Sequence, residues 1–504
     1  MMRRLSCLLL ACLALAGAAP LPAQSTPEGP LWPAVAHLFQ RPVWRNATWG
    51  VLVVSLETGD TLISWNAERP FVPASNAKLF TTAAALHYLG ADYRFVTALL
   101  ADGPLRGGTL LGDLVLYGTG DPTFAPDTAS LASFADSVVL RGIRRVRGDL
   151  VGDASFLGAE LTGPGWSPDN LDEPFASPPS ALGAAENRVK LMVFPGSRIG
   201  DIASVRVEPA NDYFRIISRV RTVARGRTRI QVQHQPNGIV ELSGNLRVTS
   251  YGWSTYLVVR QPAIFAAGLL RQLLEARGVA IDGTTRAVTD DDPDRTQAML
   301  RHGIHGTDPL AGALAVRRSM PLDELVTFIN HRSHNLSAEL LLRSIGRVAG
   351  NAGTWASGAR LVRQYLVSQV GLSPDEVQVV DGSGLSLLDR ATPRALVRLL
   401  TYMGQAPEGQ VFIQSLPLVG MGMHERMTTT AAVGRLRAKT GTLNTVSALS
   451  GYVTTEGGEA LVFSVIVNDA PSIRRARVVQ DSLGAFLAGL DRGQTAVPLR
   501  AGGN

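Results

Sequence analysis

The 504-residue sequence contains almost no cysteine, very little lysine and no long apolar run past its first residues. Its two cysteines, Cys7 and Cys12, both lie at the very start. A chain that has lost them has no disulfide, no thiolate metal site and no cysteine nucleophile. The lack of a second long apolar run argues against stable membrane insertion. No basic block is interleaved with aromatic residues either, which argues against nucleic-acid binding.

The first residues are typical of a secretory signal peptide, which we predict over residues 1–23. Arg3 and Arg4 form a basic start, an apolar stretch follows, and Ala23 ends a run that is rich in small residues. A periplasmic location is therefore expected for the mature protein. The stretch around Cys12 weakly resembles a lipoprotein cleavage site, which leaves lipidation as the alternative.

Lysine is scarce, although the chain is basic overall. Lysine and arginine total 48 against 42 acidic residues, yet the only lysines are Lys78, Lys190 and Lys439. An ammonium can lose its proton when it is buried or lies near another cation, whereas a guanidinium stays charged. We therefore interpret Lys78 and Lys439 as functional, because both lie in motifs that a serine acyl-transfer enzyme needs. Chance placement is the alternative, and Lys190 is interpreted as surface charge.

The two ends of the chain have the pattern of sheet strands. Residues 50–55 and 61–65 predict one hairpin, and residues 446–453 and 460–467 predict another. The two hairpins are expected to complete one antiparallel sheet. Helical spacing predicts helices over residues 75–89, 262–276, 320–332, 336–347, 356–370, 392–404 and 473–489.

The sequence pattern differs from that of the two ends between about residue 97 and about residue 304. Short β-rich runs alternate there with turns that are rich in Gly, Pro and Asp, and few helices are expected. This pattern predicts one or two inserted domains. None of the three motifs described next falls inside the insert.

Ser75 and Lys78 form the first motif, at the predicted start of a helix. A serine hydroxyl is a weak nucleophile until a neighbouring group takes its proton. A spacing of three residues along a helix places the lysine amine beside the hydroxyl. The helix start also offers backbone N–H groups that stabilise an anion near Ser75. Alone, this pattern arises often by chance.

Ser333, His334 and Asn335 form the second motif, in a predicted loop between two helices. Ser333 could relay a proton between a lysine and a leaving amine, and the Asn335 amide could hold a substrate carbonyl. A helix N-cap is the alternative interpretation.

Lys439, Thr440 and Gly441 form the third motif and open a predicted strand. Lys439 and Thr440 could hold a carboxylate, and Gly441 lets a substrate approach the backbone. An extended peptide could bind along this strand if it lies at the sheet edge. An ordinary strand start with a surface lysine is the alternative.

The three motifs together are the signature of β-lactamases and penicillin-binding proteins. The chain resembles the D-alanyl-D-alanine carboxypeptidase/endopeptidase family, which comprises the low-molecular-weight class C penicillin-binding proteins. The wide gap between Ser75 and Ser333 is similar to the interrupted catalytic domain of that family. Further stretches that resemble it are residues 118–123, 163–166, 180–182, 381–386 and 441–443.

The resemblance implies a β-lactamase/transpeptidase-like catalytic domain of the α/β (α+β) class, in which helices flank an antiparallel sheet and a β-rich region interrupts the chain. The expected parts are a catalytic domain over residues 24–96 and 305–490, an inserted domain II over residues 97–118 and 205–304, an inserted domain III over residues 119–204 and a disordered tail over residues 491–504.

The resemblance also implies catalytic roles at matching positions. Ser75 is expected to be the acylated nucleophile and Lys78 its base. Ser333, Asn335 and Lys439 are expected to complete proton transfer and substrate holding.

Substrate binding is implied at four more positions. Thr440 and Gly441 belong to the strand that holds the peptide, and the backbone N–H of Thr442 forms the oxyanion hole with that of the nucleophile. Asp169 is expected to contact the amino group of the diamino acid in the stem peptide. An arginine often occupies the position of Leu387 in this family, which bears on recognition of the stem carboxylate. At the middle of the second motif, where the family often has Asp, this chain has His, and change is expected to be tolerated.

The implied function is that of a serine-type D-Ala-D-Ala carboxypeptidase, with endopeptidase activity as a further expectation. It acts on peptidoglycan stem peptides, binds penicillin and other β-lactams, and needs no metal or organic cofactor. A β-lactamase or esterase on the same scaffold is one alternative, which the rate of deacylation separates. A non-catalytic protein that binds the cell envelope is the other. The sequence does not indicate an oligomeric state.

Overall fold

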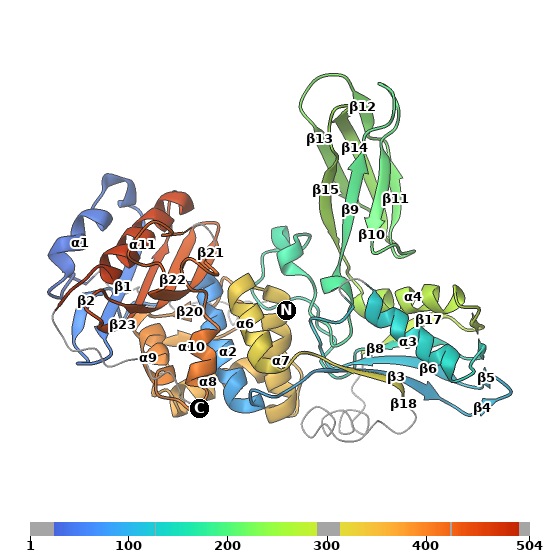
Figure 1. The fold of residues 1–504 in the computed structure, drawn as a ribbon, viewed down its shortest axis with the longest axis horizontal. Helices are drawn as coiled ribbons and strands as arrows, with labels where there is room; N and C mark the ends of the chain where they lie inside the picture. The colour runs from blue at the N-terminus through green and yellow to red at the C-terminus, as the bar shows by residue number, and fades with distance from the viewer. Residues whose placement is uncertain (1–24, 126–127, 290–312, 424–425, 493–504) are drawn as a thin grey trace, which may run out of the picture.

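The computed structural model describes residues 25–125, 128–289, 313–423 and 426–492. The predicted signal peptide lies outside the described residues, as does the predicted tail past residue 492. Figure 1 shows a sheet-and-helix body at one end, an extended α/β part at the other, and a β-rich lobe that projects between them. Among the described helices, none combines the length and the hydrophobicity that a bilayer span requires.

The two ends of the chain complete one antiparallel sheet, as predicted. The strand order is β2-β1-β23-β22-β21, and every neighbouring pair is antiparallel. In β1, the residues from Thr48 to Ser55 pair with β23 residues from Asn468 back to Leu461. The strands are β1 (Thr48–Ser55), β2 (Thr61–Trp65), β21 (Leu436–Leu443), β22 (Val446–Thr454) and β23 (Ala460–Asn468).

Helices cover both faces of this sheet, because alternate residues of each strand point to opposite sides. Val51 and Val53 pack with α1 and α11, whereas Leu52 packs with the larger helical group. Strands buried on both faces have nearly continuous apolar sequences, as β22 and β23 do. The helices are α1 (Trp32–Phe39), α2 (Ala77–Leu89), α6 (Leu322–Arg332), α7 (Asn335–Gly350), α8 (Trp355–Ser368), α9 (Pro393–Met403), α10 (Gly409–Gln414) and α11 (Ile473–Ala488).

The α/β part of the insert is built on a second five-stranded sheet with the order β17-β8-β6-β3-β18. Helices α3 (Ala129–Leu140) and α4 (Pro262–Glu275) share its hydrophobic core. The strands are β3 (Val96–Asp102), β6 (Asp113–Gly118), β8 (Leu150–Asp153), β17 (Thr285–Val288) and β18 (Ala313–Arg318), with short strands β4 (Leu105–Arg106), β5 (Thr109–Leu110), β7 (Arg145–Val146) and β16 (Ala280–Ile281) beside them.

The projecting lobe consists of two small sheets (Figure 1). One has the order β10-β9-β15, and in the other β14 pairs with β11, β12 and β13. The strands are β9 (Arg188–Phe194), β10 (Ser204–Glu208), β11 (Arg215–Ser218), β12 (Arg221–Val223), β13 (Arg229–His234), β14 (Ile239–Arg247) and β15 (Trp253–Val258).

The strand pairings join segments that the sequence assigns to different domains. β9 falls in the predicted domain III but pairs with β10 and β15, which fall in the predicted domain II. β18 falls in the range predicted for the catalytic domain but pairs with β3 of the insert. Strand pairing between distant segments decides this grouping, and local periodicity does not reveal it.

Arg343 of α7 ties the insert to the catalytic helices. Its side chain is fully buried. The guanidinium donates hydrogen bonds to the carbonyl oxygens of Glu160 at 2.9 Å, Pro179 at 2.8 Å and Gly353 at 3.0 Å, and also to Gly158. A planar donor with five N–H groups suits such convergent binding of carbonyl groups. The loop of the insert over residues 158–179 is thereby held against the catalytic helices.

Replacing Arg343 with methionine should lower the free energy of unfolding by about 3 kcal/mol or more, because hydrogen bonds from a charged donor are worth about 1.5–3 kcal/mol each. Urea denaturation measures the change. Arg474, which is exposed on α11, provides the matched control, and Arg474→Met should leave stability unchanged. An Arg343→Met variant as stable as this control would contradict the anchoring role.

Candidate active site

Ser75 lies in η2 (Ala74–Asn76), a single 3-10 turn that leads directly into α2. The predicted helix start is therefore confirmed, with one tighter turn ahead of it. Ala74 has a φ of 47°, in the left-handed region. Such a conformation costs a non-glycine residue about 1–3 kcal/mol and persists only where the surroundings hold it. Here Ala74 is completely buried, so packing fixes the backbone on which Ser75 stands.

Lys78 Nζ has three oxygen neighbours. It lies 2.9 Å from Ser75 Oγ, 2.7 Å from Asn335 Oδ1 and 2.7 Å from the carbonyl oxygen of Ser383. The amide and carbonyl oxygens can only accept hydrogen bonds. A neutral amine that donates its two N–H groups to these oxygens keeps its lone pair for the Ser75 hydroxyl. The geometry thus suits removal of the serine proton by Lys78.

Burial lowers the pKa of Lys78 from 10.5 to about 8. The charges of Asp381, Glu339 and Asp389 act in the opposite direction but do not outweigh burial. The pKa of Lys439 is also held well below its ordinary value, by burial first and by the charge of Lys78 second. Desolvation by burial therefore dominates the shift at Lys78.

Three buried carboxylates lie behind the lysine. Burial, with the charge of Asp381 adding to it, raises the pKa of Glu339 to about 7. The same two causes raise the pKa of Asp389 well above its ordinary value. Part of this cluster therefore stays protonated near neutral pH, which limits its opposition to the low pKa of Lys78.

Glu339 and Asp381 also shape the loop that faces Lys78. Glu339 accepts hydrogen bonds from the backbone N–H of Gly382 at 3.0 Å and of Ser383 at 2.8 Å. Asp381 accepts from the backbone N–H of Gly384 at 2.7 Å. Gly384 has a φ of 78°, and a Cβ there would come within 1.9 Å of the Ala74 carbonyl oxygen. This tight turn aims the Ser383 carbonyl at Lys78.

Ser333 and His334 form the junction between α6 and α7. Ser333 ends α6 with a φ of 52°, and its Oγ accepts a hydrogen bond from Lys439 Nζ at 2.9 Å. His334 is the N-cap of α7 and accepts from the backbone N–H of Ser337 through Nδ1. Its Nε2 lies 3.3 Å from Oε2 of Glu186 in the insert. The N-cap interpretation is thus correct for His334. Ser333 instead contacts Lys439 of the third motif.

Asn335 is oriented by the insert. Its Nδ2 donates to the carbonyl oxygen of Phe175, 2.9 Å away in η4 (Pro174–Ala176). This bond turns Oδ1 toward Lys78 and so settles which end of the amide faces the amine. Sequence motifs identify side chains and give no sign of a contact made by a backbone carbonyl. The sequence therefore did not indicate a role for Phe175.

Lys439 lies on β21, the edge strand of the central sheet. The strand begins at Leu436 rather than at Lys439, where the sequence predicts its start. The backbone of residues 417–419 pairs with the first part of β21, where Val419 N donates to Leu436 O and Ala438 N donates to Pro417 O. In the described part of the chain, no strand pairs with that edge from Lys439 onward. This open length is where an extended peptide can add to the sheet.

Gly441 brings β21 close to the nucleophile. A Cβ at this position would lie 3.1 Å from the Ser75 nitrogen and 2.9 Å from the Pro73 carbonyl oxygen. Asn76 links the same two segments, because its Nδ2 donates to the Lys439 carbonyl oxygen at 2.9 Å. The strand therefore passes the start of α2 at a distance that only glycine permits, and Thr442 follows directly, exposed to solvent. Arg477 of α11, which motif spacing did not indicate, donates to Thr442 Oγ1.

The two remaining candidates lie at the margin of the site. Asp169 is exposed in η3 (Pro168–Asn170) of the insert and makes no hydrogen bond or ion pair with any described residue. Its flanks, Trp166 and Leu171, pack in one apolar cluster with Leu385. Leu387 is half exposed on the adjoining loop, where its N–H bonds to the Gly165 carbonyl oxygen. Asp169 is therefore near the cleft but is not joined to the lysine network.

The fold and the family follow from comparison with known proteins. The penicillin binding protein 4 (dacB) of Haemophilus influenzae is similar in structure, with a TM-score of 0.77, 24% identity, and coverage of 90% of this chain and 99% of that one. Its complex with a β-lactam gives a TM-score of 0.72. The fold is thus of the transpeptidase-like class, with a sheet flanked by helices, as expected.

The sequence matches the family described as "D-Ala-D-Ala carboxypeptidase 3 (S13) family" over residues 33–489. The D-alanyl-D-alanine carboxypeptidase of Actinomadura sp. (strain R39) is 35% identical over 469 residues, which cover 90% of this chain and 83% of that protein. DacB of Haemophilus influenzae is 24% identical over 427 residues, 83% of this chain and 85% of that protein. The chain belongs to this carboxypeptidase family, and its activity class is that of a serine D-Ala-D-Ala carboxypeptidase.

The rate of acylation by penicillin should rise with pH around a pKa near 8. Only the neutral amine of Lys78 can take a proton, so the active fraction grows as pH passes upward through that pKa. Stopped-flow labelling from about pH 6 to about pH 10 measures the profile. Lys78→Arg, whose guanidinium stays charged, should lower the rate by about 10²-fold or more. A profile flat over this range would remove Lys78 as the base.

Proposed function

We propose that Ser75 is the nucleophile through which this carboxypeptidase removes the terminal D-Ala of peptidoglycan stem peptides. The observation that supports this most is the oxygen environment of Lys78, in which two pure acceptors leave the amine lone pair for the Ser75 hydroxyl. The low pKa of Lys78 adds to it, since a base must be neutral at the working pH.

In the first step, Ser75 Oγ attacks the carbonyl carbon of the penultimate D-Ala while its proton passes to Lys78 Nζ. The backbone N–H groups of Ser75 and Thr442 stabilise the oxyanion that forms. Lys439 and Thr440 bind the terminal carboxylate of the substrate, at the part of β21 that no described strand covers.

In the second step, the carbon–nitrogen bond breaks and the terminal D-Ala leaves as an amine. Its nitrogen receives the proton that Lys78 took from Ser75, relayed by way of Ser333, whose Oγ is hydrogen-bonded to Lys439 Nζ at 2.9 Å. Asn335 holds a carbonyl of the peptide. Water then attacks the ester on Ser75, and the shortened peptide leaves with a new carboxylate.

We further propose that residues 1–23 direct export, so that the enzyme meets its substrate in the periplasm. Penicillin acylates the same serine, because its ring amide takes the place of the scissile peptide bond. The segment that carries Asp169 is proposed to read the stem peptide, since its flanks pack with Leu385 and Leu443 beside the third motif. Leu387 offers this part of the cleft an apolar side chain rather than a cation.

Ser75→Ala should abolish labelling by fluorescent penicillin and lower D-Ala release from a soluble pentapeptide by about 10³-fold or more. Mass spectrometry of the penicillin-treated protein should place the adduct on the peptide that contains Ser75. Ser133, a serine exposed on α3, is the matched control, and Ser133→Ala should keep full activity. Labelling that survives in Ser75→Ala would overturn the assignment of the nucleophile.

Repeated turnover of a chromogenic cephalosporin would favour the β-lactamase alternative. The carboxypeptidase assignment predicts a single burst whose size equals the amount of enzyme, followed by slow deacylation.

A further inference from the structure

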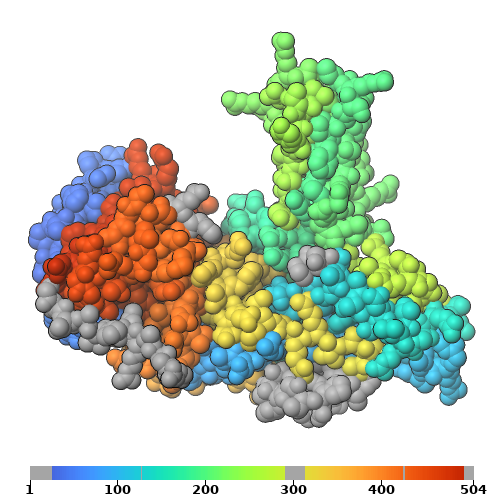
Figure 2. Space-filling view, in the orientation of Figure 1, coloured from blue at the N-terminus to red at the C-terminus, as the bar shows by residue number. Residues whose placement is uncertain are grey.

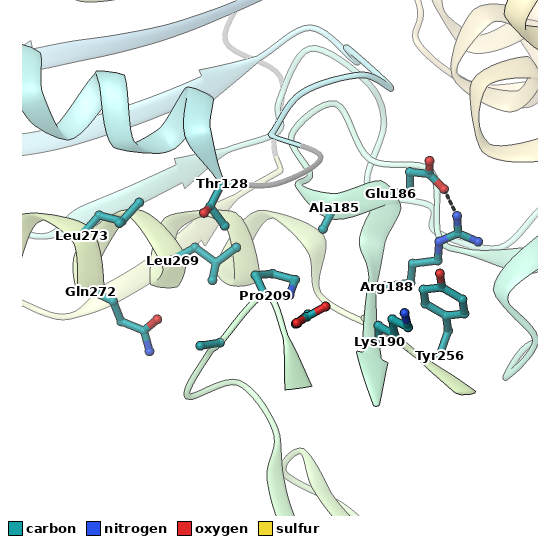
Figure 3. Close-up of a pocket in the computed structure, with 12 residues that line it drawn as sticks. Thr128, Ala185, Glu186, Arg188, Lys190, Pro209, Tyr256, Leu269, Gln272 and Leu273 are labelled. Atoms are coloured by element: carbon teal, nitrogen blue, oxygen red, sulfur yellow. Dashed lines mark ion pairs between the residues drawn. The ribbon is translucent and has the colours of Figure 1, made fainter. Parts of the chain in front are cut away.

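The insert contains a cavity of about 690 Å³ that lies apart from the three motifs (Figure 3). Its volume falls within the range of about 300–1,000 Å³ that is usual for ligand pockets. One wall comes from β9, β10 and β15 of the projecting lobe, and the opposite wall comes from α4 (Figure 3). Figure 2 shows the base of that lobe, where it meets the α/β part.

Lys190 stands in the middle of the polar wall. On β9 it is directly opposite Glu208 of β10 on one side and Tyr256 of β15 on the other. Arg188 is two residues away on the same strand and therefore on the same face. Its guanidinium stacks on the Tyr256 ring, 4.5 Å from the ring centre. The interpretation of Lys190 as surface charge is incomplete, because the side chain is half-buried and lines this cavity.

Lys190 is the cation of this wall that forms no ion pair with a described residue, although Glu208 lies opposite it on the neighbouring strand. Arg188 is paired with Glu186, and Glu208 is paired with Arg206 at 2.7 Å. Among the described residues, Lys190 has no hydrogen-bond or ion-pair partner. A carboxylate that enters the cavity would give this ammonium an ion-pair partner.

The remaining lining suits a flexible peptide rather than a compact anion. Leu269 and Leu273 of α4 form an apolar surface, while Thr128 and Gln272 offer neutral polar groups. Phosphate recognition usually relies on several converging donors or cations, and Lys190 is the one cation of this lining without an ion-pair partner among the described residues. A chain with amide groups, aliphatic side chains and one free carboxylate matches the lining.

This cavity adjoins the catalytic cleft. A second cavity of about 290 Å³ is lined by Ser333 and Asn335 of the second motif. Glu186 and Arg188 line both cavities. The ion pair between them therefore stands between the two spaces, and Glu186 contacts the catalytic loop through His334.

We propose that the cavity around Lys190 binds the carboxylate of a second stem peptide on the same peptidoglycan polymer, while a neighbouring stem occupies the catalytic cleft. The proposal rests on the proposed function, because an enzyme that acts on the polymer encounters several stems at once. Lys190 binds the carboxylate, and the apolar face of α4 contacts the aliphatic part of the stem.

Co-sedimentation with purified peptidoglycan sacculi tests this proposal in a Ser75→Ala background, where turnover is absent. Lys190→Met should weaken binding by about tenfold, the effect of losing one charge-assisted hydrogen bond. Lys190→Arg should retain binding, because the charge is kept. Arg227, an exposed basic residue between β12 and β13 of the same lobe that does not line the cavity, provides the control, and Arg227→Met should bind as the parent does.

Competition identifies the group that is bound. A free stem tetrapeptide should displace the protein from sacculi, and the same peptide with its carboxylates amidated should not. Displacement by inorganic phosphate alone would overturn the assignment to a carboxylate. Unchanged binding of Lys190→Met, or an equal loss in Arg227→Met, would overturn the site itself.

A separate measurement tests the proposed function: release of D-Ala from a soluble pentapeptide by the protein that keeps Ser75. If that release fails while the effect of Lys190→Met persists, the carboxypeptidase assignment falls and polymer binding at the cavity stands. If release succeeds and Lys190→Met has no effect on sacculus binding, only the cavity assignment falls.

Discussion

The burial of one amine is the constraint on which the rest of the site depends. Lys78 has no exposed surface, and its Nζ is enclosed by the Ser75 hydroxyl, an amide oxygen and a backbone carbonyl. Burial disfavours the charged form, so the lysine is available as a base closer to neutral pH than a free lysine is. The charges of the nearby carboxylates oppose this effect without outweighing it, and burial raises the pKa of Glu339 and of Asp389 as well.

Each acceptor around that amine is held by a different part of the chain. The Ser383 carbonyl is aimed by a loop whose N–H groups bind Glu339 and Asp381. The Asn335 amide is turned by the carbonyl of Phe175, which belongs to the insert. Arg343 in turn anchors the neighbouring part of the insert to α7. The insert is therefore part of the catalytic architecture, although none of the three motifs lies within it.

Much of this arrangement could be predicted from the sequence. The apolar runs at both ends predict the central sheet, and the rarity of lysine singles out Lys78 and Lys439. What local patterns cannot show is which distant segments pair. β9 joins β10 and β15 through backbone hydrogen bonds between strands that are distant in the sequence, so the segments predicted for domains II and III share one sheet. Contacts made by backbone carbonyls, such as that of Phe175, are equally invisible, because every residue has such a group.

The pKa of Lys78 is the quantity that tests this account most directly. Because the chain has only three lysines, a protein labelled with carbon-13 at the lysine side chains should give three resolvable signals, which Lys→Arg variants can assign. The account predicts that the signal of Lys78 titrates near 8. Titration of that signal at its ordinary value of 10.5 or above would show a charged amine beside Ser75 and would contradict the account.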